Sequence, residues 1–188
     1  HPPAFSVARS AGRHDGSLRQ IIHAFKYEHR RALAEPLARL MLEAGGLVLD
    51  GADAVVPVPL HPLRSLRRGF NQADDLARCL GLPVWRLLRR RRHGPPQATL
   101  PAARRHGNLR GAYALGVLAS NFNPGRRARG ATVVLVDDVM TTGATLDACA
   151  RVLRTEGISD VRALTAARAV ATPPIRPQPP PRLWPTPR

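Results

Sequence analysis

The chain has 188 residues, a length that suits one domain with a core large enough to fold alone. Its hydrophobic fraction of 44% is ordinary for a globular protein, and no apolar run approaches the roughly 20 residues that span a bilayer. The formal net charge of +16 favours polyanionic partners such as nucleotides, pyrophosphate or nucleic acid. An aromatic fraction of 4% supplies few side chains for stacking single-stranded bases.

The amino terminus and the cysteines bear on the cellular setting. The sequence starts with His1 rather than Met and shows no signal peptide, which leaves open that it is a fragment of a longer open reading frame. Cys79 and Cys149 are far apart on expected helices, a placement that favours buried thiols over a disulfide or a metal site. We therefore expect a reduced, cytoplasmic protein.

The first third of the chain predicts two helices. Residues 1–15 show no periodicity, and we expect a flexible lead-in there. From Ser17 to Tyr27 the apolar residues recur at helical spacing, so one face of this helix packs inward. A second helical pattern covers 33–41 and should end at the glycine pair 45–46, a good helix stop. Pro36 suits the first turn of that helix.

A buried strand is expected at 54–59, and a basic loop with three arginines, Arg64, Arg67 and Arg68, follows it. A helix should then run over 71–80. In open α/β sheets, ligands bind at the carboxyl ends of the strands. Arginine suits pyrophosphate there because its planar fork can bond two oxygens at once.

The middle and the end of the chain are less regular. Residues 82–88 suggest a short strand or turn, and the arginine run 89–92 opens a long basic loop that continues to about Tyr113. Long loops in compact domains are usually functional or disordered. A strand is expected at 161–169. The proline-rich residues 172–188 should form a disordered tail, which leaves 1–171 as the folded domain.

The strongest pattern lies between Val133 and Thr155. Residues 133–136 form a short apolar run typical of a strand buried on both faces, and the carboxylates Asp137 and Asp138 follow at once. The small-residue turn 141–143 then leads into a helix over 144–155. Such a turn aims backbone N–H groups and the positive end of the helix dipole at one point. This arrangement predicts a cradle for a phosphate, beside two carboxylates that can accept hydrogen bonds from sugar hydroxyls.

Two rival phosphate-binding motifs do not fit this pattern. A P-loop needs a lysine after its glycines, and the only lysine in the chain is Lys26. A dinucleotide fingerprint needs G-x-G-x-x-G ahead of a distant acid, whereas here the acids precede a single glycine.

Residues 133–145 resemble the signature of type I phosphoribosyltransferases at every position. The resemblance implies an α/β fold with a parallel sheet flanked by helices and a flexible hood loop. It also implies that Asp137 and Asp138 contact the ribose 2′- and 3′-hydroxyls of phosphoribosyl pyrophosphate (PRPP), which is bound with Mg²⁺. The 5′-phosphate would then be held by the residues of the loop, Thr141, Thr142, Gly143, Ala144 and Thr145.

The run Pro57-Val58-Pro59-Leu60, the run Arg67-Arg68-Gly69-Phe70-Asn71-Gln72 and the distal acidic pair together resemble the ComF family, whose members are linked to competence and DNA uptake. The resemblance covers roughly Ser17 to Arg168. It implies that Arg64, Arg67 and Arg68 form the pyrophosphate loop. It also implies hood positions at Gln97, Arg105, Asn108 and Tyr113.

The sequence departs from these families in two respects. Many ComF proteins carry an amino-terminal zinc ribbon of paired Cys-x-x-Cys motifs, and this chain has none, so we expect no structural zinc. Thr141 stands where purine-salvage phosphoribosyltransferases place an aspartate, and a threonine cannot act as a general base at neutral pH. This difference argues against hypoxanthine or guanine and leaves the acceptor open.

Two functions remain in balance at this point. The first is an enzyme that transfers phosphoribosyl from PRPP to a nitrogen acceptor with Mg²⁺. The alternative is a non-catalytic module that keeps the PRPP or nucleotide pocket and acts in DNA uptake through single-stranded DNA or a protein partner. The basic charge favours the alternative and the sparse aromatics weaken it. A third hypothesis is an α/β protein whose site has lost its function. The sequence also leaves open whether the protein forms a homodimer.

Overall fold

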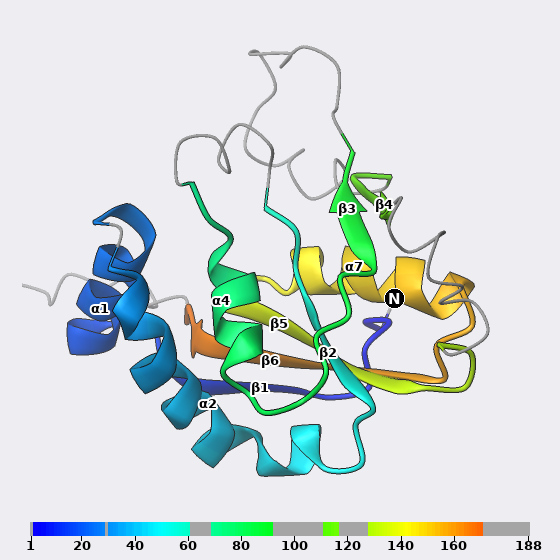
Figure 1. Ribbon diagram of the computed structural model, residues 1–188, viewed down its shortest axis with the longest axis horizontal. Helices are drawn as coiled ribbons and strands as arrows, with labels where there is room; N and C mark the ends of the chain where they lie inside the picture. The colour runs from blue at the N-terminus through cyan, green and yellow to red at the C-terminus, as the bar shows by residue number, and fades with distance from the viewer. Residues whose placement is uncertain (1, 29, 61–68, 92–110, 117–127, 171–188) are drawn as a thin grey trace, which may run out of the picture.

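The computed structural model of the chain describes residues 2–28, 30–60, 69–91, 111–116 and 128–170 (Figure 1). Its centre is a sheet of four strands in the order β1-β6-β5-β2, in which all neighbours run parallel. The strands are β1 (Ala8–Arg13), β2 (Ala54–Pro57), β5 (Thr132–Met140) and β6 (Asp160–Arg168). A small antiparallel pair stands beside this sheet, formed by β3 (Leu88–Arg90) and β4 (Tyr113–Leu115).

Helices cover both faces of the parallel sheet, as the sequence predicts. The helices are α1 (Gly16–Tyr27), α2 (Ala34–Leu49), α4 (Gln72–Arg78) and α7 (Ala144–Thr155), with a short 3₁₀ turn, η1 (Arg31–Leu33). The first three pack into one core, in which Phe25, Met41 and Leu76 are fully buried. The fourth packs on the opposite face together with the β3–β4 pair, through Leu146 and Leu153.

Strand β5 shows why the sheet sits between two cores. Successive side chains of a strand point to opposite faces. Val133 and Leu135 therefore enter the core under α7, while Val134 and Val136 enter the core under α1, α2 and α4. All four are fully buried. The continuous apolar run is thus explained by burial on both faces, and the prediction of a doubly covered strand is confirmed.

The expectation of a flexible lead-in over 1–15 is wrong, because part of that segment is a strand. Residues 8–13 form β1, which pairs with β6 from Ala8↔Ala163 to Arg13↔Arg168. The hydroxyls of Ser10 and Thr165 lie 2.7 Å apart across this pairing. Since the partner strand lies 155 residues away in the sequence, local periodicity could not reveal the strand. Its small and polar residues carry little alternation of their own.

The expected stop of the second helix at 45–46 is also wrong, because α2 continues through both glycines to Leu49. Gly45 lies against the sheet, where a Cβ atom would stand 2.9 Å from the Cδ2 atom of Leu164. A Cβ on Gly46 would meet nothing within 4 Å. Gly45 thus permits a close approach of helix to strand, rather than ending the helix. Pro36 lies in the first turn, as predicted.

The two glycines give a matched pair for a stability test. Gly46→Ala should raise the free energy of unfolding by about 0.5–1 kcal/mol, because alanine loses less backbone entropy in a helix. Gly45→Ala should lower the free energy of unfolding by about 1 kcal/mol, because overpacking against the fully buried Leu164 outweighs the same gain. Urea unfolding of both variants measures the difference, and a more stable Gly45→Ala would contradict the close-packing explanation.

Two other boundaries differ from the prediction. Strand β5 runs on through Asp137 and Asp138 to Met140, because β6 continues beside it and pairs as far as Arg168. The arginine run expected in a loop starts inside β3, where Arg89 pairs with Ala114 of β4. The predicted helices over 71–80 and 144–155 are confirmed as α4 and α7. The boundary between 1–171 and 172–188 stays a prediction.

Within the described residues, no helix is both long enough and apolar enough to cross a membrane.

Candidate functional site

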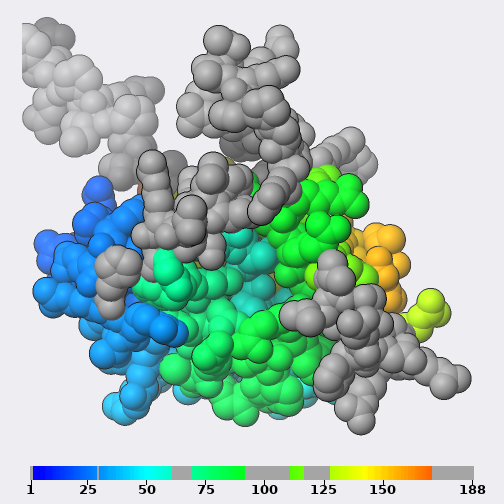
Figure 2. All heavy atoms as spheres, turned by 45° about the horizontal axis from the view of Figure 1, so that its top comes forward, coloured from blue at the N-terminus to red at the C-terminus, as the bar shows by residue number. Residues whose placement is uncertain are grey.

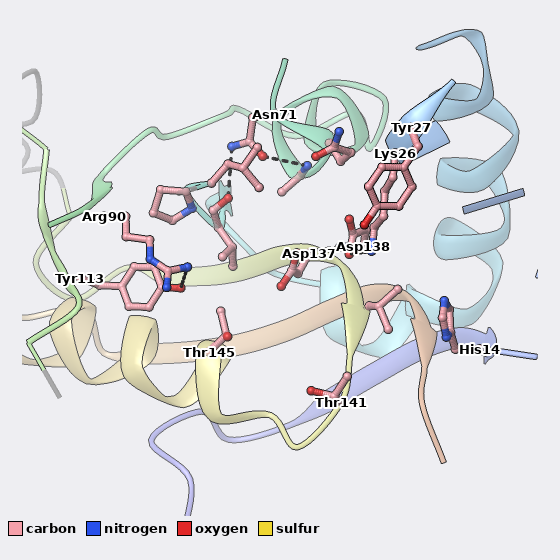
Figure 3. Close-up of a pocket in the computed structure, with 16 residues that line it drawn as sticks. His14, Lys26, Tyr27, Asn71, Arg90, Tyr113, Asp137, Asp138, Thr141 and Thr145 are labelled. Carbon is pink, nitrogen blue, oxygen red and sulfur yellow. Dashed lines mark hydrogen bonds and ion pairs between the residues drawn. The ribbon is translucent and has the colours of Figure 1, made fainter. Parts of the chain in front are cut away.

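A pocket of about 340 Å³ opens at the carboxyl ends of β2 and β5. In the space-filling view, α1 and α2 in blue lie on one side of this end of the sheet and β3 in green lies on the other (Figure 2). Side chains from both sides reach the pocket (Figure 3). The labelled lining residues are His14, Lys26, Tyr27, Asn71, Arg90, Tyr113, Asp137, Asp138, Thr141 and Thr145.

The turn between β5 and α7 brings the first turn of that helix to the pocket. Gly143 occupies the N-cap position of α7 with φ of 79°, a left-handed conformation that favours glycine. The Thr142 hydroxyl accepts a hydrogen bond from the Ala144 N–H at 3.3 Å, which shapes the turn. The first N–H groups of a helix have no acceptor within that helix and point outward. Thr141 and Thr145 line the pocket, so the first turn of α7 faces it.

The acidic pair lies at the centre of the pocket, on the last part of β5 (Figure 3). The backbone N–H of Asp138 donates a 2.9 Å hydrogen bond to Oδ1 of Asp137. The Nζ atom of Lys26 lies 2.8 Å from Oδ1 of Asp138, and the two side chains are only 18% and 13% exposed. The only lysine of the chain is therefore a pocket residue, held there by the last turn of α1. The sequence analysis missed this role because the pattern shows only that Lys26 lies near a helix end.

The pocket shifts the ionisation of its side chains. Burial, and then repulsion from Asp138, raise the pKa of Asp137 from 3.8 to about 7, although Lys26 opposes the shift. Burial, and then the positive charges of Lys26 and Arg19, lower the pKa of His14. His14 therefore loses its proton at a lower pH than an ordinary histidine does.

The raised pKa of Asp137 predicts a pH-dependent stability. An unfolded aspartate loses its proton near pH 4, whereas folded Asp137 keeps it to about pH 7. The folded state binds more protons in this window, so the free energy of unfolding falls as the pH rises from about 4 to about 7. Asp137→Asn removes the penalty. Its melting temperature should exceed that of the wild type more at pH 8 than at pH 5, and an equal gain at both would contradict the shift.

The ion pair between Lys26 and Asp138 predicts a second stability effect. Lys26→Met leaves a mostly buried carboxylate without its cation and should lower the free energy of unfolding by about 2–3 kcal/mol. Adding Asp138→Asn should recover most of that loss. Arg39→Met is the matched control, because the Arg39–Glu35 pair is 71% and 66% exposed and surface pairs contribute little. Equal losses from Lys26→Met and Arg39→Met in urea unfolding would contradict the prediction.

The opposite wall of the pocket carries Arg90 and Tyr113. Arg90 donates a hydrogen bond from Nη1 to the Tyr113 hydroxyl at 3.4 Å, and its guanidinium lies 5.4 Å from the centre of the Tyr113 ring. Burial, and then Cys149, raise the pKa of Tyr113, while Arg90 and a side-chain hydrogen bond with Thr145 oppose the shift. Tyr113 therefore connects β3 to the first turn of α7. The sequence analysis named Tyr113 in the hood and placed Arg90 in a loop, but both line this pocket.

Asn71 shapes the third wall, between β2 and α4. Its side chain accepts a hydrogen bond from the Ala73 N–H at 3.2 Å and donates one to the Val58 carbonyl at 3.1 Å. This cap brings the start of α4 back to the end of β2, where Val58, Pro59 and Leu60 line the pocket.

Several predicted site residues lie outside the described part of the chain. These are Arg64, Arg67 and Arg68 of the expected pyrophosphate loop, and Gln97, Arg105 and Asn108 of the expected hood. Across the ranges that the structure does describe, no group of three or more His, Cys, Asp or Glu side chains could hold a metal ion. Cys79 and Cys149 are free thiols.

The parallel sheet, the acidic pair and the turn before α7 together define a type I phosphoribosyltransferase fold. The phosphoribosyl transferase domain family matches residues 65–176 of the chain. Among solved structures, a glutamine PRPP amidotransferase from B. subtilis is 23% identical and has a TM-score of 0.47. The match covers 77% of this chain and 27% of the amidotransferase chain. An orotate phosphoribosyltransferase from Aeropyrum pernix is 22% identical and has a TM-score of 0.43. The match covers 76% of this chain and 75% of that enzyme. These two likenesses concern the fold alone.

The chain belongs to the ComF family of phosphoribosyltransferase-like proteins. Competence protein F of Haemophilus influenzae is 36% identical over 180 residues, which are 89% of this chain and 75% of that protein. DNA utilization protein YhgH of Escherichia coli K12 is 31% identical over 183 residues, which are 90% of this chain and 75% of that protein. Competence protein ComFC of Bacillus subtilis is 33% identical over 108 residues, which are 57% of this chain and 41% of that protein.

Proposed function

We propose that the pocket binds PRPP or a nucleoside 5′-monophosphate, and that the protein transfers the phosphoribosyl group to a nitrogen acceptor. One observation carries this proposal. The acidic pair and the turn before α7 border the same pocket, so a sugar and its phosphate could occupy it together. The ribose hydroxyls would donate hydrogen bonds to Asp137 and Asp138. The 5′-phosphate would accept them from the turn and the first N–H groups of α7.

The chemistry of this arrangement is electrostatic. Breaking the bond from C1 of the ribose to pyrophosphate builds positive charge on the sugar, and the nearby carboxylates stabilise it. The pyrophosphate leaves with negative charge, which Arg64, Arg67 and Arg68 would offset, because in the sequence they follow Leu60, which lines the pocket. Mg²⁺ would enter with PRPP and supply further positive charge to the leaving group.

The acceptor is narrowed by Thr141, which lines the pocket. Its hydroxyl cannot remove a proton as a carboxylate would at neutral pH, which argues against hypoxanthine and guanine. A reduced, cytoplasmic setting belongs to this proposal, because Cys79 and Cys149 are unpaired thiols.

Two measurements test the enzyme proposal. Calorimetry with PRPP and Mg²⁺ should show saturable binding, and pyrophosphate release with a panel of nitrogen bases should identify the acceptor. If the protein binds neither PRPP nor ribose 5-phosphate, the site assignment is wrong. Binding of PRPP without release of pyrophosphate from any base would favour a module that only binds the ligand.

Such a module is the second candidate function, acting in DNA uptake through single-stranded DNA or a protein partner. Its relatives carry the names competence protein F and DNA utilization protein, and the chain has a net charge of +16. Contacts to a phosphate backbone release counterions, so the affinity should fall steeply with salt, by about 0.7 per phosphate in the log–log slope. Fluorescence anisotropy with single-stranded DNA at low and physiological salt measures this slope. Absence of binding at low salt would remove single-stranded DNA as the partner of this module.

A further inference from the structure

Eight of the sixteen arginines in the described part of the chain are paired with carboxylates. The ion pairs are Arg13–Asp15, Arg30–Glu28, Arg31–Asp75, Arg39–Glu35, Arg78–Asp74, Arg86–Asp74, Arg151–Asp147 and Arg162–Asp160. Arg90 differs from all of these, because it contacts no carboxylate within 4 Å among the described residues. It is also the one arginine, of those described, that lines the pocket. Its positive charge therefore faces a cavity rather than an acid.

The position of Arg90 follows from the alternation of β3. Successive side chains on this strand point to opposite sides. Arg89 is exposed and donates from Nε to the Leu115 carbonyl at 2.9 Å, whereas Arg90 is half-buried and lines the pocket. The expected run of solvent-facing arginines over 89–92 is thus divided by the strand.

Tyr113 holds the Arg90 guanidinium in place through two contacts. Its hydroxyl accepts the 3.4 Å hydrogen bond from Nη1, and its ring lies under the guanidinium at 5.4 Å from the ring centre. Thr145, in the first turn of α7, lines the same pocket as Tyr113. The guanidinium, the tyrosine and the helix start therefore form a wall on one side of the pocket, opposite Lys26 (Figure 3).

We propose that Arg90, positioned by Tyr113, binds the phosphoryl group that the turn before α7 cradles. This inference rests on the proposed function and adds a ligand-binding residue to it. The helix start offers N–H donors from the chain backbone, and a guanidinium adds a forked pair of charged donors from the facing strand. A phosphoryl group held from both sides makes charge-assisted hydrogen bonds in a partly buried setting, where water screens them less. Tyr113 acts as a positioning residue.

The test compares Arg90→Gln with Arg89→Gln, its neighbour on the same strand. Calorimetry with ribose 5-phosphate, PRPP and inorganic pyrophosphate separates the phosphoryl groups. Arg90→Gln should weaken ribose 5-phosphate and PRPP to a similar extent, by about 10- to 100-fold, the range expected for a charged hydrogen bond. Pyrophosphate binding should change little. Arg89→Gln removes the same charge and should leave all three affinities nearly unchanged.

Two further variants keep the test valid if Arg90→Gln does not fold, which thermal unfolding would reveal. Arg90→Lys keeps the charge but loses the fork, and Tyr113→Phe removes only the hydroxyl. Both variants should lower the affinity for ribose 5-phosphate severalfold, a smaller loss than the one expected for Arg90→Gln. The affinity for pyrophosphate should not change.

The outcomes separate this inference from the proposed function. If the wild-type protein binds neither PRPP nor ribose 5-phosphate, the proposed function fails. If the wild type binds both and Arg90→Gln matches Arg89→Gln, only the role of Arg90 is overturned. A loss for PRPP and pyrophosphate with ribose 5-phosphate unchanged would also overturn it, by assigning Arg90 to the leaving group.

Discussion

Thr145→Trp is expected to abolish measurable binding of ribose 5-phosphate and PRPP, a loss of at least about 100-fold. Thr145 lies in the first turn of α7 and lines the pocket, so an indole there would fill the space in front of the turn. Each charged hydrogen bond from the turn to a phosphate is worth about 1.5–3 kcal/mol, and losing two of them accounts for the expected effect. Isothermal calorimetry with both ligands measures it.

The same helix supplies a control for this variant. Thr155 is exposed at the other end of α7, where its hydroxyl donates to the Arg151 carbonyl. Thr155→Trp adds the same bulk to the same helix away from the pocket and should bind both ligands as the wild type does. If Thr145→Trp also binds them normally, the phosphate cradle does not lie at the start of α7.

The second large effect is expected from the acidic pair. Asp137→Asn and Asp138→Asn should each weaken PRPP and ribose 5-phosphate by about 10- to 100-fold, because an amide accepts a weaker hydrogen bond from a ribose hydroxyl than a carboxylate does. Inorganic phosphate has no sugar to hold, so its affinity should change little. Competition calorimetry with phosphate and ribose 5-phosphate compares the two effects within each variant.

Asp138→Asn has an additional consequence, which provides an internal comparison. It releases Lys26 from its ion pair at 2.8 Å, so the pocket gains a free ammonium group as well as losing a carboxylate. Phosphate affinity should therefore rise slightly in Asp138→Asn. Equal losses for phosphate and for ribose 5-phosphate in both variants would show that the carboxylates act on the overall charge and not on the sugar.

The sequence alone was sufficient for the parts of this protein that depend on neighbours along the chain. The apolar run 133–136 predicts a strand buried on both faces, and the structure confirms that placement. Gly143 permits the left-handed N-cap that turns the strand into α7, and Asn71 caps α4 by accepting a hydrogen bond from the N–H two residues ahead. The two caps are set by contacts within a few residues, and the strand is marked by its own unbroken apolar run, so each signal is visible in the order of residue types.

Segments that depend on distant partners were beyond local reasoning. Strand β1 forms because β6 offers it a free edge. Gly45 lies inside α2 because a residue without a side chain lets the helix pack closely on Leu164. Neither feature changes the local pattern of apolar residues. A glycine pair reads as a helix end unless the strand that it packs against is known.

The residues of the candidate site also fall into a group that local sequence predicts and a group that only tertiary structure brings together. The acidic pair and the residues 141–145 were predicted from the sequence, because strand, turn and helix are consecutive and their geometry is local. Tertiary structure alone decided which cations join them. Among many basic residues, packing buries Lys26 against Asp138 from α1 and places Arg90 on Tyr113 from β3. The ionisation of Asp137 was likewise decided by tertiary structure, because burial and charge proximity arise only when distant segments meet.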